Sequence, residues 1–310
     1  MSLNQSVLIC DQVNPILKEV LEKNGLKVTY EPEITHDQIA EKIGNFEVVV
    51  VRSRTKITRE LVEKADKCKI IARVGVGLDN IDQDAAKENS IRVLNAVEGA
   101  ITAVAELVIG LMLSMAREIP RADREVRDGN WIKKELMGNE LRGEYLGIVG
   151  LGNIGKRLGR LARALNMNII GFDVAPIDEE FSKEVGLMKA DLGTLLASSD
   201  YVSLHVPLLD STKHLINTEK MGTMKNTARI INTSRGGVID EDALYEFLKD
   251  GKLGGAALDV FEVEPATSNN LSSLPNFIST PHMGAQTNEA QSLAANVIAE
   301  KIIQILRGVT

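Results

Sequence analysis

Short runs of apolar, often β-branched residues alternate along this chain with amphipathic segments of helical period, and this alternation constrains the fold more than any other feature. In the first third the apolar runs are "SVLIC", "LKVTY", "FEVVVVRS", "KIIARVG" and "IRVLN". Segments such as "NPILKEVLEKNG" and "TRELVEKADK" separate them. Strands that alternate with helices are typical of parallel sheets covered by helices. The sequence therefore predicts an α/β protein.

The alternation stops at a long apolar helix, "AITAVAELVIGLMLSMARE", and a charged one, "RADREVRDGN", and then begins again. The second series of strands is "GEYLGIVGLG", "NIIGFD", "YVSLHVP", "ARIINTS", "GAALDVF" and "FISTPH". The final helix, "NEAQSLAANVIAEKIIQILRG", has no strand after it and can return to the first domain. We expect two Rossmann-like or flavodoxin-like parallel-sheet domains separated by an active-site cleft, a substrate-binding domain of residues 1–97 with 285–310 and a nucleotide-binding domain of residues 98–284.

Composition excludes several classes of function. A net charge of -7 and a pI near 5.3 argue against nucleic acid or an anionic membrane as the main partner, since both need a basic excess. The start, "MSLNQSVLICD", does not resemble a signal peptide, and no run of about 18 uninterrupted apolar residues follows, so we expect a soluble cytoplasmic protein. Cys10 and Cys68 have no His or Cys close by in sequence, so we expect buried thiols and no metal site.

The second series opens with a glycine motif. Gly150, Gly152 and Gly155 have the G-x-G-x-x-G spacing, follow an apolar strand and precede a helix. The first glycine makes the turn, the second lets the main chain approach a pyrophosphate, and the third lets helix and strand pack closely. Asp173 ends the next strand, where its carboxylate would bind an adenosine ribose and repel a 2′-phosphate. The motif therefore predicts NAD as cofactor in preference to NADP.

Four chemically active side chains stand at or beyond the ends of later strands: Arg235, Asp259, Glu264 and His282. Ligands of doubly wound sheets bind outside the carboxyl ends of the strands. An arginine matches a carboxylate, and a histidine bonded to a glutamate can move a proton. Each residue alone has a simpler interpretation, since His282 could cap a loop and Glu264 could belong to a solvated acidic turn. Their joint occurrence favours an active site.

An ordered set of motifs over nearly the whole chain resembles the D-2-hydroxyacid dehydrogenase family. The motifs are "VRSRTKIT", "RVGVGLDNID", "WIKKELMGNELRG", "GIVGLGNIG", "NTSRGGVIDEDAL", "GAALDVFEVEP" and "PHMGAQT". The resemblance implies that His282 is the acid/base for the C2 hydroxyl, with Glu264 as its partner and Glu262 as a bystander. It also implies that Arg235 holds the substrate carboxylate and carbonyl oxygen. The main chain of Val74, Gly75 and Val76 would approach that carboxylate.

The same resemblance implies a set of cofactor contacts, with Asp259 facing the nicotinamide carboxamide. These contacts are Val76, Gly150, Gly152, Asn153, Ile154, Gly155, Asp173, His205, Val206, Pro207, Thr233, Ser234, Asp259, Gly284 and Ala285.

The choice of substrate depends on basic residues of the first domain. Arg52 and Ser53 follow the third strand and Arg73 ends the fourth, and these positions match phosphate or substrate contacts in the phosphoglycerate branch of the family. They could instead be surface charges paired with nearby acids. The resemblance implies NAD-dependent oxidation of 3-phospho-D-glycerate to 3-phosphohydroxypyruvate, the entry to serine synthesis. The alternatives are a glyoxylate or hydroxypyruvate reductase or another D-2-hydroxyacid dehydrogenase without a phosphate site, a formate-type relative, and a nucleotide-sensing corepressor.

Three further expectations concern partners and departures from the family pattern. The long apolar helix suggests burial against a second subunit, and the resemblance implies a homodimer in which Lys133 and Lys134 reach toward the partner. The chain ends at residue 310 without the regulatory domains of many relatives, so we expect no feedback by serine through such a domain. Asn153 and Gln286 depart from residues common in close relatives, which could alter cofactor affinity.

Overall fold

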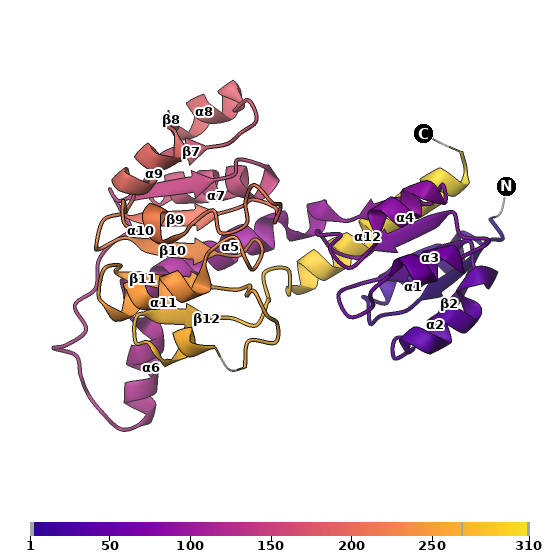
Figure 1. The fold of residues 1–310 in the computed structure, drawn as a ribbon, viewed down its shortest axis with the longest axis horizontal. Helices are drawn as coiled ribbons and strands as arrows, with labels where there is room; N and C mark the ends of the chain where they lie inside the picture. Colours follow the sequence, from indigo (N-terminus) through magenta and orange to yellow (C-terminus); the bar gives the residue numbers. More distant parts are fainter. Residues whose placement is uncertain (1–2, 268, 309–310) are drawn as a thin grey trace. The chain divides into compact units, whose positions relative to one another are not determined.

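The structure is a computed structural model that describes residues 3–267 and 269–308. It contains two compact units, Met1–Ala103 with Ala285–Thr310, and Val104–Gly284. Each unit is built around one parallel sheet (Figure 1). This confirms the predicted fold class, while the cleft stays a prediction. The division between the units falls inside a continuous helix, six residues after the boundary that the restart of the pattern suggested.

The first unit has a five-stranded sheet in the order β2-β1-β3-β4-β5, which is the flavodoxin-like order. Its strands are β1 (Ser6–Ile9), β2 (Lys27–Tyr30), β3 (Val48–Val51), β4 (Ile70–Arg73) and β5 (Arg92–Asn95). Its helices are α1 (Ile16–Lys23), α2 (His36–Lys42), η1 (Ile43–Asn45), α3 (Arg59–Glu63), α4 (Gln83–Glu88) and α12 (Asn288–Leu306).

Alternate residues of the central strands face two separate apolar layers in this unit. Val48 and Val50 of β3 pack with α1 and α12, whereas Val49 and Val51 pack with α2, α3 and α4. All four of these valines are buried, as expected for a parallel strand that is covered on both faces. The last helix thus contributes to the core of the unit that begins the chain.

The second unit has a seven-stranded sheet in the order β12-β11-β10-β9-β6-β7-β8. Its strands are β6 (Tyr145–Val149), β7 (Asn168–Phe172), β8 (Met188–Lys189), β9 (Tyr201–Leu204), β10 (Arg229–Asn232), β11 (Gly255–Leu258) and β12 (Phe277–Ser279). Its helices are α6 (Ile119–Arg127), α7 (Asn153–Ala164), α8 (Glu179–Val185), α9 (Leu192–Ser198), α10 (Thr218–Met221), α11 (Glu241–Lys249) and η2 (Asn270–Ser273). When β6 is counted as the first strand, the sheet read from β8 to β11 has the dinucleotide-binding order 3-2-1-4-5-6. β12 is one further strand, next to β11.

Helices cover both faces of this sheet as well. One apolar layer contains α9, α10 and α11, and the other contains α7, α8 and the second half of α5 (Val97–Ala116). α5 is long and apolar enough to span a membrane, with a mean hydropathy of 1.9 over its most apolar stretch, but 56% of that stretch is buried inside the structure. Core helices of globular proteins pass the same test, so burial accounts for its composition.

Candidate functional site

The order of strands identifies one edge of each sheet where a ligand can bind. In an open α/β sheet, ligands occupy the carboxyl ends of the strands at the point where the strand order reverses. That point lies between β6 and β9 in the second unit and between β1 and β3 in the first. The glycine motif follows β6, and the "VRSR" segment follows β3. Two of the expected ligand-binding segments therefore lie at the switch points of their own sheets.

The three glycines after β6 do three different things. Gly150 has a φ of 94° and lies so close to β9 that an added Cβ would be 2.5 Å from the His205 carbonyl oxygen. An added Cβ on Gly155 would collide with the Gly150 carbonyl oxygen, which allows α7 to pack tightly on the turn. At Gly152, which precedes α7, an added Cβ would meet nothing within 4 Å. The space in front of the α7 N-terminus is therefore open, as pyrophosphate binding requires.

Asp173 and Thr233 fit a dinucleotide in the same unit. The Asp173 carboxylate accepts hydrogen bonds from the Leu151 main-chain N–H at 2.6 Å and from Ala175 at 2.8 Å, which fixes it beside the glycine turn. The hydroxyl of Thr233, at the end of β10, is buried and has no hydrogen-bond partner within the described residues. A buried polar atom without a partner is costly unless a ligand supplies one. The residues present thus fit NAD, which would supply a hydride acceptor when bound.

His205, Val206 and Pro207 follow β9 on the other side of the glycine turn. The His205 ring lies 2.9 Å from the Ser203 hydroxyl through Nε2. Although the residue keeps some solvent exposure, burial lowers the pKa of His205 to about 4. Its ring is therefore neutral near neutral pH, and this histidine does not match a proton-transfer role in that range.

The turn that carries Arg235 is held by a buried asparagine at the end of β10. The Asn232 side chain accepts hydrogen bonds from the Ser234 N–H and hydroxyl, at 3.0 and 2.7 Å, and donates one to the Arg235 carbonyl oxygen at 2.8 Å. An added Cβ on Gly236 would collide with the Phe261 carbonyl oxygen. The Arg235 turn is thus packed directly against the segment that follows β11, and its guanidinium makes local contacts that include the Ser234 carbonyl oxygen.

His282 and Glu264 form a hydrogen-bonded pair. Nδ1 of His282 lies 2.8 Å from Oε2 of Glu264. An ionised carboxylate only accepts hydrogen bonds, so Nδ1 carries the proton and Nε2 is left to exchange a proton with a ligand. The other oxygen of Glu264 accepts from the Phe261 N–H at 3.1 Å, which fixes the carboxylate. The sequence predicted this pairing, while the role of the pair as a general acid/base and its orienting group stays a prediction.

Asp259, at the end of β11, fixes the main chain around His282. It is 1% exposed and accepts three hydrogen bonds, from the Thr280 hydroxyl at 2.6 Å and from the Met283 and Gly284 N–H groups at 2.8 Å each. His282 itself has a φ of 52°, a conformation that needs such support in a residue other than glycine. Both carboxylate oxygens thus have partners within the protein, and the expected contact with a nicotinamide carboxamide stays a prediction.

In the first unit a buried carboxylate, which sequence reasoning missed, organises the segment after β3. Asp11 follows β1 and accepts from the Arg52 N–H at 2.5 Å, the Thr55 hydroxyl at 2.6 Å and the Thr55 N–H at 3.2 Å. The Arg54 side chain lies 3.2 Å from the same carboxylate. The Arg52 guanidinium donates to the Gln286 amide oxygen at 2.9 Å. Burial lowers the pKa of Arg52, although the negative charge of Asp11 acts in the opposite direction. The signal for Asp11 was its place directly after a strand at the switch point.

Arg73 makes more contacts with its own unit than a free anion-binding arginine would. It donates to the Arg52 and Gly77 carbonyl oxygens, and Nη2 lies 3.4 Å from the Ser53 hydroxyl. Asn80, also missed from the sequence, donates to the Arg52 carbonyl oxygen at 2.8 Å. Arg73 therefore helps to order the "VRSR" segment whatever it binds. The nearby main chain of Val74–Val76 is held through Val76, whose carbonyl oxygen accepts from the Asn95 side chain at 2.6 Å.

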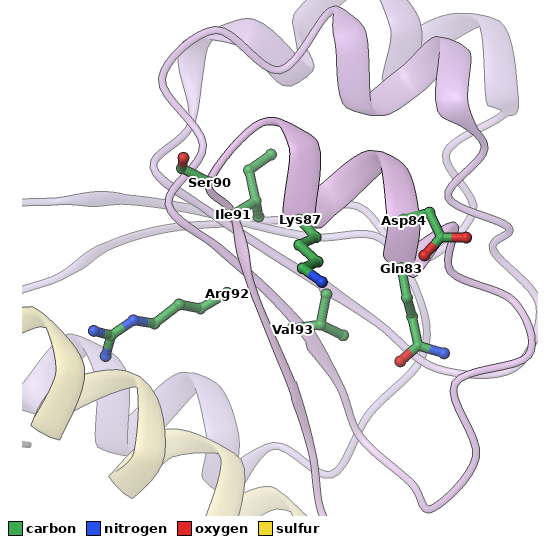
Figure 2. Close-up of a pocket in the computed structure, with 7 residues that line it drawn as sticks. All are labelled: Gln83, Asp84, Lys87, Ser90, Ile91, Arg92 and Val93. Carbon is green, nitrogen blue, oxygen red and sulfur yellow. The ribbon is translucent and has the colours of Figure 1, made fainter.

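A hollow of about 450 Å³ on the first unit contains none of the predicted site residues. It lies between α4 and β5, where Lys87 and Arg92 are the basic residues of its lining (Figure 2). In Figure 2 the Arg92 side chain extends away from Lys87, so the two cations do not converge on one anion.

The fold and the glycine turn define an NAD-binding α/β protein with a hydrogen-bonded His–Glu pair at the carboxyl edge of its nucleotide-binding sheet. The sequence pattern described as "D-isomer specific 2-hydroxyacid dehydrogenase, NAD binding domain" matches residues 109–284. The chain belongs to this family, and NAD is its cofactor.

Individual relatives agree with that membership. The D-3-phosphoglycerate dehydrogenase of Methanocaldococcus jannaschii is 46% identical over 303 residues, covering 97% of this chain and 57% of the relative. The hydroxypyruvate reductase of Thermotoga maritima is 46% identical over 300 residues, covering 94% and 96%. The holo D-mandelate dehydrogenase of Rhodotorula graminis has a TM-score of 0.91 at 30% identity, covering 97% and 94%. The chain spans little more than half the length of the phosphoglycerate dehydrogenases that it matches.

Two glycine-to-alanine substitutions should separate cofactor binding from stability. Gly152→Ala places a methyl group in the open space before α7, so we expect NAD affinity to fall about tenfold or more with little change in unfolding. Gly155→Ala drives a methyl group into the Gly150 carbonyl oxygen, so it should destabilise the fold by about 1–3 kcal/mol. Calorimetric titration with NAD and urea denaturation measure the two effects. Unchanged NAD affinity in Gly152→Ala would contradict the assignment of the pyrophosphate to this space.

Proposed function

We propose that this protein oxidises a D-2-hydroxy acid with NAD, with 3-phospho-D-glycerate as the leading substrate. The 2.8 Å pair of His282 and Glu264 carries the proposal, because it stands at the carboxyl edge of the sheet that holds the NAD-binding turn. Arg235 stands at the same edge, after β10. Family membership supports the reaction class.

Each residue of this set has a defined task in the proposed reaction. His282 Nε2 accepts the proton of the C2 hydroxyl while the C2 hydrogen leaves as hydride to the cofactor, so the acid becomes a 2-oxo acid and NAD becomes NADH. The Glu264 carboxylate stabilises the positive ring that results. The Arg235 guanidinium binds the substrate carboxylate and polarises the C2 oxygen. In the reverse direction His282 returns the proton.

The phosphorylated substrate is favoured by the basic residues of the first unit. A phosphate group adds about two negative charges to the substrate carboxylate, so it needs cations besides Arg235. Arg52 and Arg73 supply two cations at the switch point of the first sheet, and Ser53 adds a hydroxyl. Asp11 and Asn80 hold this segment. The relatives named D-3-phosphoglycerate dehydrogenase support this choice. The product would be 3-phosphohydroxypyruvate, the first intermediate of serine synthesis from phosphoglycerate.

A second candidate is the reduction of hydroxypyruvate or a similar unphosphorylated acid. The Arg52 guanidinium already has the Gln286 amide as a partner, and Arg73 bonds to the main chain, so neither is fully available to a phosphate. The hydroxypyruvate reductase of Thermotoga maritima also matches over nearly its whole length.

A comparison of substrates decides between the two. We expect wild-type protein to form NADH faster from 3-phospho-D-glycerate than from D-glycerate or D-lactate, and to prefer NAD to NADP because of Asp173. In Arg52→Ala, kcat/KM for the phosphorylated acid should fall about 10- to 100-fold, while that for D-glycerate changes little. Lys56→Ala removes a nearby cation that is exposed, and it serves as the control.

The opposite preference would reassign the substrate. If wild-type protein uses D-glycerate or hydroxypyruvate at least as well as the phosphorylated acids, and Arg52→Ala changes nothing, the phosphate site is wrong. The roles of His282, Glu264 and Arg235 would still hold for the general 2-hydroxy acid reaction. Absence of NADH formation with every acid tested would contradict the proposed function itself.

We further propose that the protein is a homodimer through α6 and its flanking segments. Five large apolar side chains between residues 113 and 137 are exposed, and Trp131 and Met137 are 81% and 87% accessible. Figure 1 shows α6 and the segment after it extending away from the body of the second unit. A monomer rarely exposes so many large apolar residues in one region, and a second copy of the chain would cover them.

The single tryptophan of the chain reports on this interface. Trp131 should emit at shorter wavelength in the dimer than in a variant with Met137→Ser and Val126→Ser, which removes apolar contact area around it. Sedimentation should give a dimer for wild-type protein and a shift toward the 33.8 kDa monomer for the variant. A fully active wild-type protein that sediments as a stable monomer would contradict the proposal.

A further inference from the structure

A group of hydrogen-bonded side chains, one of which lies two residues before Glu264, links three segments of the second unit. Its members are His214, Glu241, Glu262 and Asn269, which we call the Glu262 clamp. They line one side of a hollow of about 330 Å³, together with Asp240, Asp242 and Tyr245. The family resemblance implies that Glu262 is a bystander, yet its side chain and main chain make several hydrogen bonds.

The clamp holds the segment that follows β11 at two residues, Glu262 and Asn269. The Glu262 N–H donates to Glu241 Oε1 at 2.6 Å, and the Glu241 N–H points back to Glu262 Oε1 at 3.5 Å. His214 Nε2 lies 3.0 Å from the same Glu262 oxygen. Asn269 donates to the second Glu241 oxygen at 2.9 Å. Glu262 is therefore fixed to the first residue of α11 and to the segment before α10.

This arrangement is costly, so it calls for a reason. Burial raises the pKa of Glu241, and the nearby negative charge of Glu262 raises it further. Two carboxylates remain close only because main-chain N–H groups, an imidazole and an amide converge on them, and because Glu241 begins a helix, where negative charge is favoured.

The clamp also connects the turn that carries Arg235 with the segment that carries Glu264. Glu264 is two residues beyond Glu262, and its carboxylate is fixed by the N–H of Phe261, the residue before Glu262. The His214 N–H donates to the Gly237 carbonyl oxygen at 2.7 Å, within the turn that carries Arg235. Glu262 and Glu264 thus belong to one short segment, which the clamp holds at Glu262 and the Glu264 carboxylate holds at Phe261.

We propose that Glu262, held by Glu241 and His214, is a positioning residue that sets the Glu264 carboxylate against His282. It rests on the proposed function only for its kinetic consequence, because the geometry of the pair can be measured without turnover. The clamp touches neither substrate nor cofactor in this role. Its effect passes entirely through Glu264.

The kinetic test uses substitutions at Glu262. Glu262→Ala should lower kcat about 10- to 100-fold, with KM and NAD affinity changed less than threefold, since a small misplacement of a catalytic group has effects of that order. Glu262→Gln keeps an acceptor for His214 and should recover most of the activity. Asp242→Asn, which removes another carboxylate of the same hollow, is the matched control and should behave as wild type.

A double substitution distinguishes positioning from a general loss of structure. In a Glu264→Gln background, Glu262→Ala should cost less than threefold more, because its route to His282 is already weakened. A full additional loss in that background, or a Glu262→Ala protein as active as wild type, would overturn the proposal. Urea denaturation of each variant identifies any that fail to fold, and Glu262→Gln then takes the place of Glu262→Ala.

An NMR readout separates this proposal from the proposed function. The imidazole signals of His282 should shift in Glu262→Ala in the same direction as in Glu264→Gln, and should not shift in Asp242→Asn. This result would support the clamp even if none of the 2-hydroxy acids were oxidised. Unchanged His282 signals in Glu262→Ala would overturn it even in an active enzyme.

Discussion

The candidate site depends on the buried carboxylate of Asp259. It joins the end of β11 to the turn after β12 by three hydrogen bonds, and that turn holds His282 in a conformation that residues with a Cβ rarely adopt. Hydrogen bonds to a carboxylate are strong, and a buried carboxylate that loses them is costly. The turn is therefore held in essentially one arrangement. The direction of the His282 ring follows from this arrangement, and Glu264 completes it.

The same principle recurs in the first unit. Asp11 follows β1 as Asp259 follows β11, and each buried carboxylate accepts main-chain and hydroxyl donors from the turn after the neighbouring strand. In both sheets, therefore, an aspartate at a carboxyl edge fixes a turn that carries residues of the proposed site. Parallel sheets collect such turns at one edge, which is why residues more than forty positions apart in sequence meet there.

The sequence allowed the fold class and most of the candidate site to be predicted because these features have local signatures. Strand and helix periods, the spacing of Gly150, Gly152 and Gly155, and the strand-end positions of Arg235 and His282 are all visible in short windows. β8 was missed because it has only two residues, both exposed, and so shows no apolar run. The length of α5 was also clear, but not where along it the two compact units divide.

The contacts that hold the site could not be predicted, since they join residues far apart in the chain. Asp11 reaches Arg52 over 41 positions and Glu241 reaches Glu262 over 21. Glu262 shows the limit most clearly, because an acid close to Glu264 gives the same local pattern whether or not it has hydrogen-bond partners elsewhere in the chain. Arg73 shows it too, since a strand-end arginine can serve its own main chain as well as an anion.

We propose that His282 exchanges the proton that accompanies hydride transfer, and single-turnover kinetics measures this step. Enzyme saturated with NAD would be mixed with the preferred 2-hydroxy acid, and the rate of NADH formation followed for wild type and for His282→Asn. We expect a loss of about 10²- to 10⁴-fold in the hydride-transfer rate with NAD affinity preserved. A variant that transfers hydride within about threefold of the wild-type rate would contradict it and assign the proton to another group.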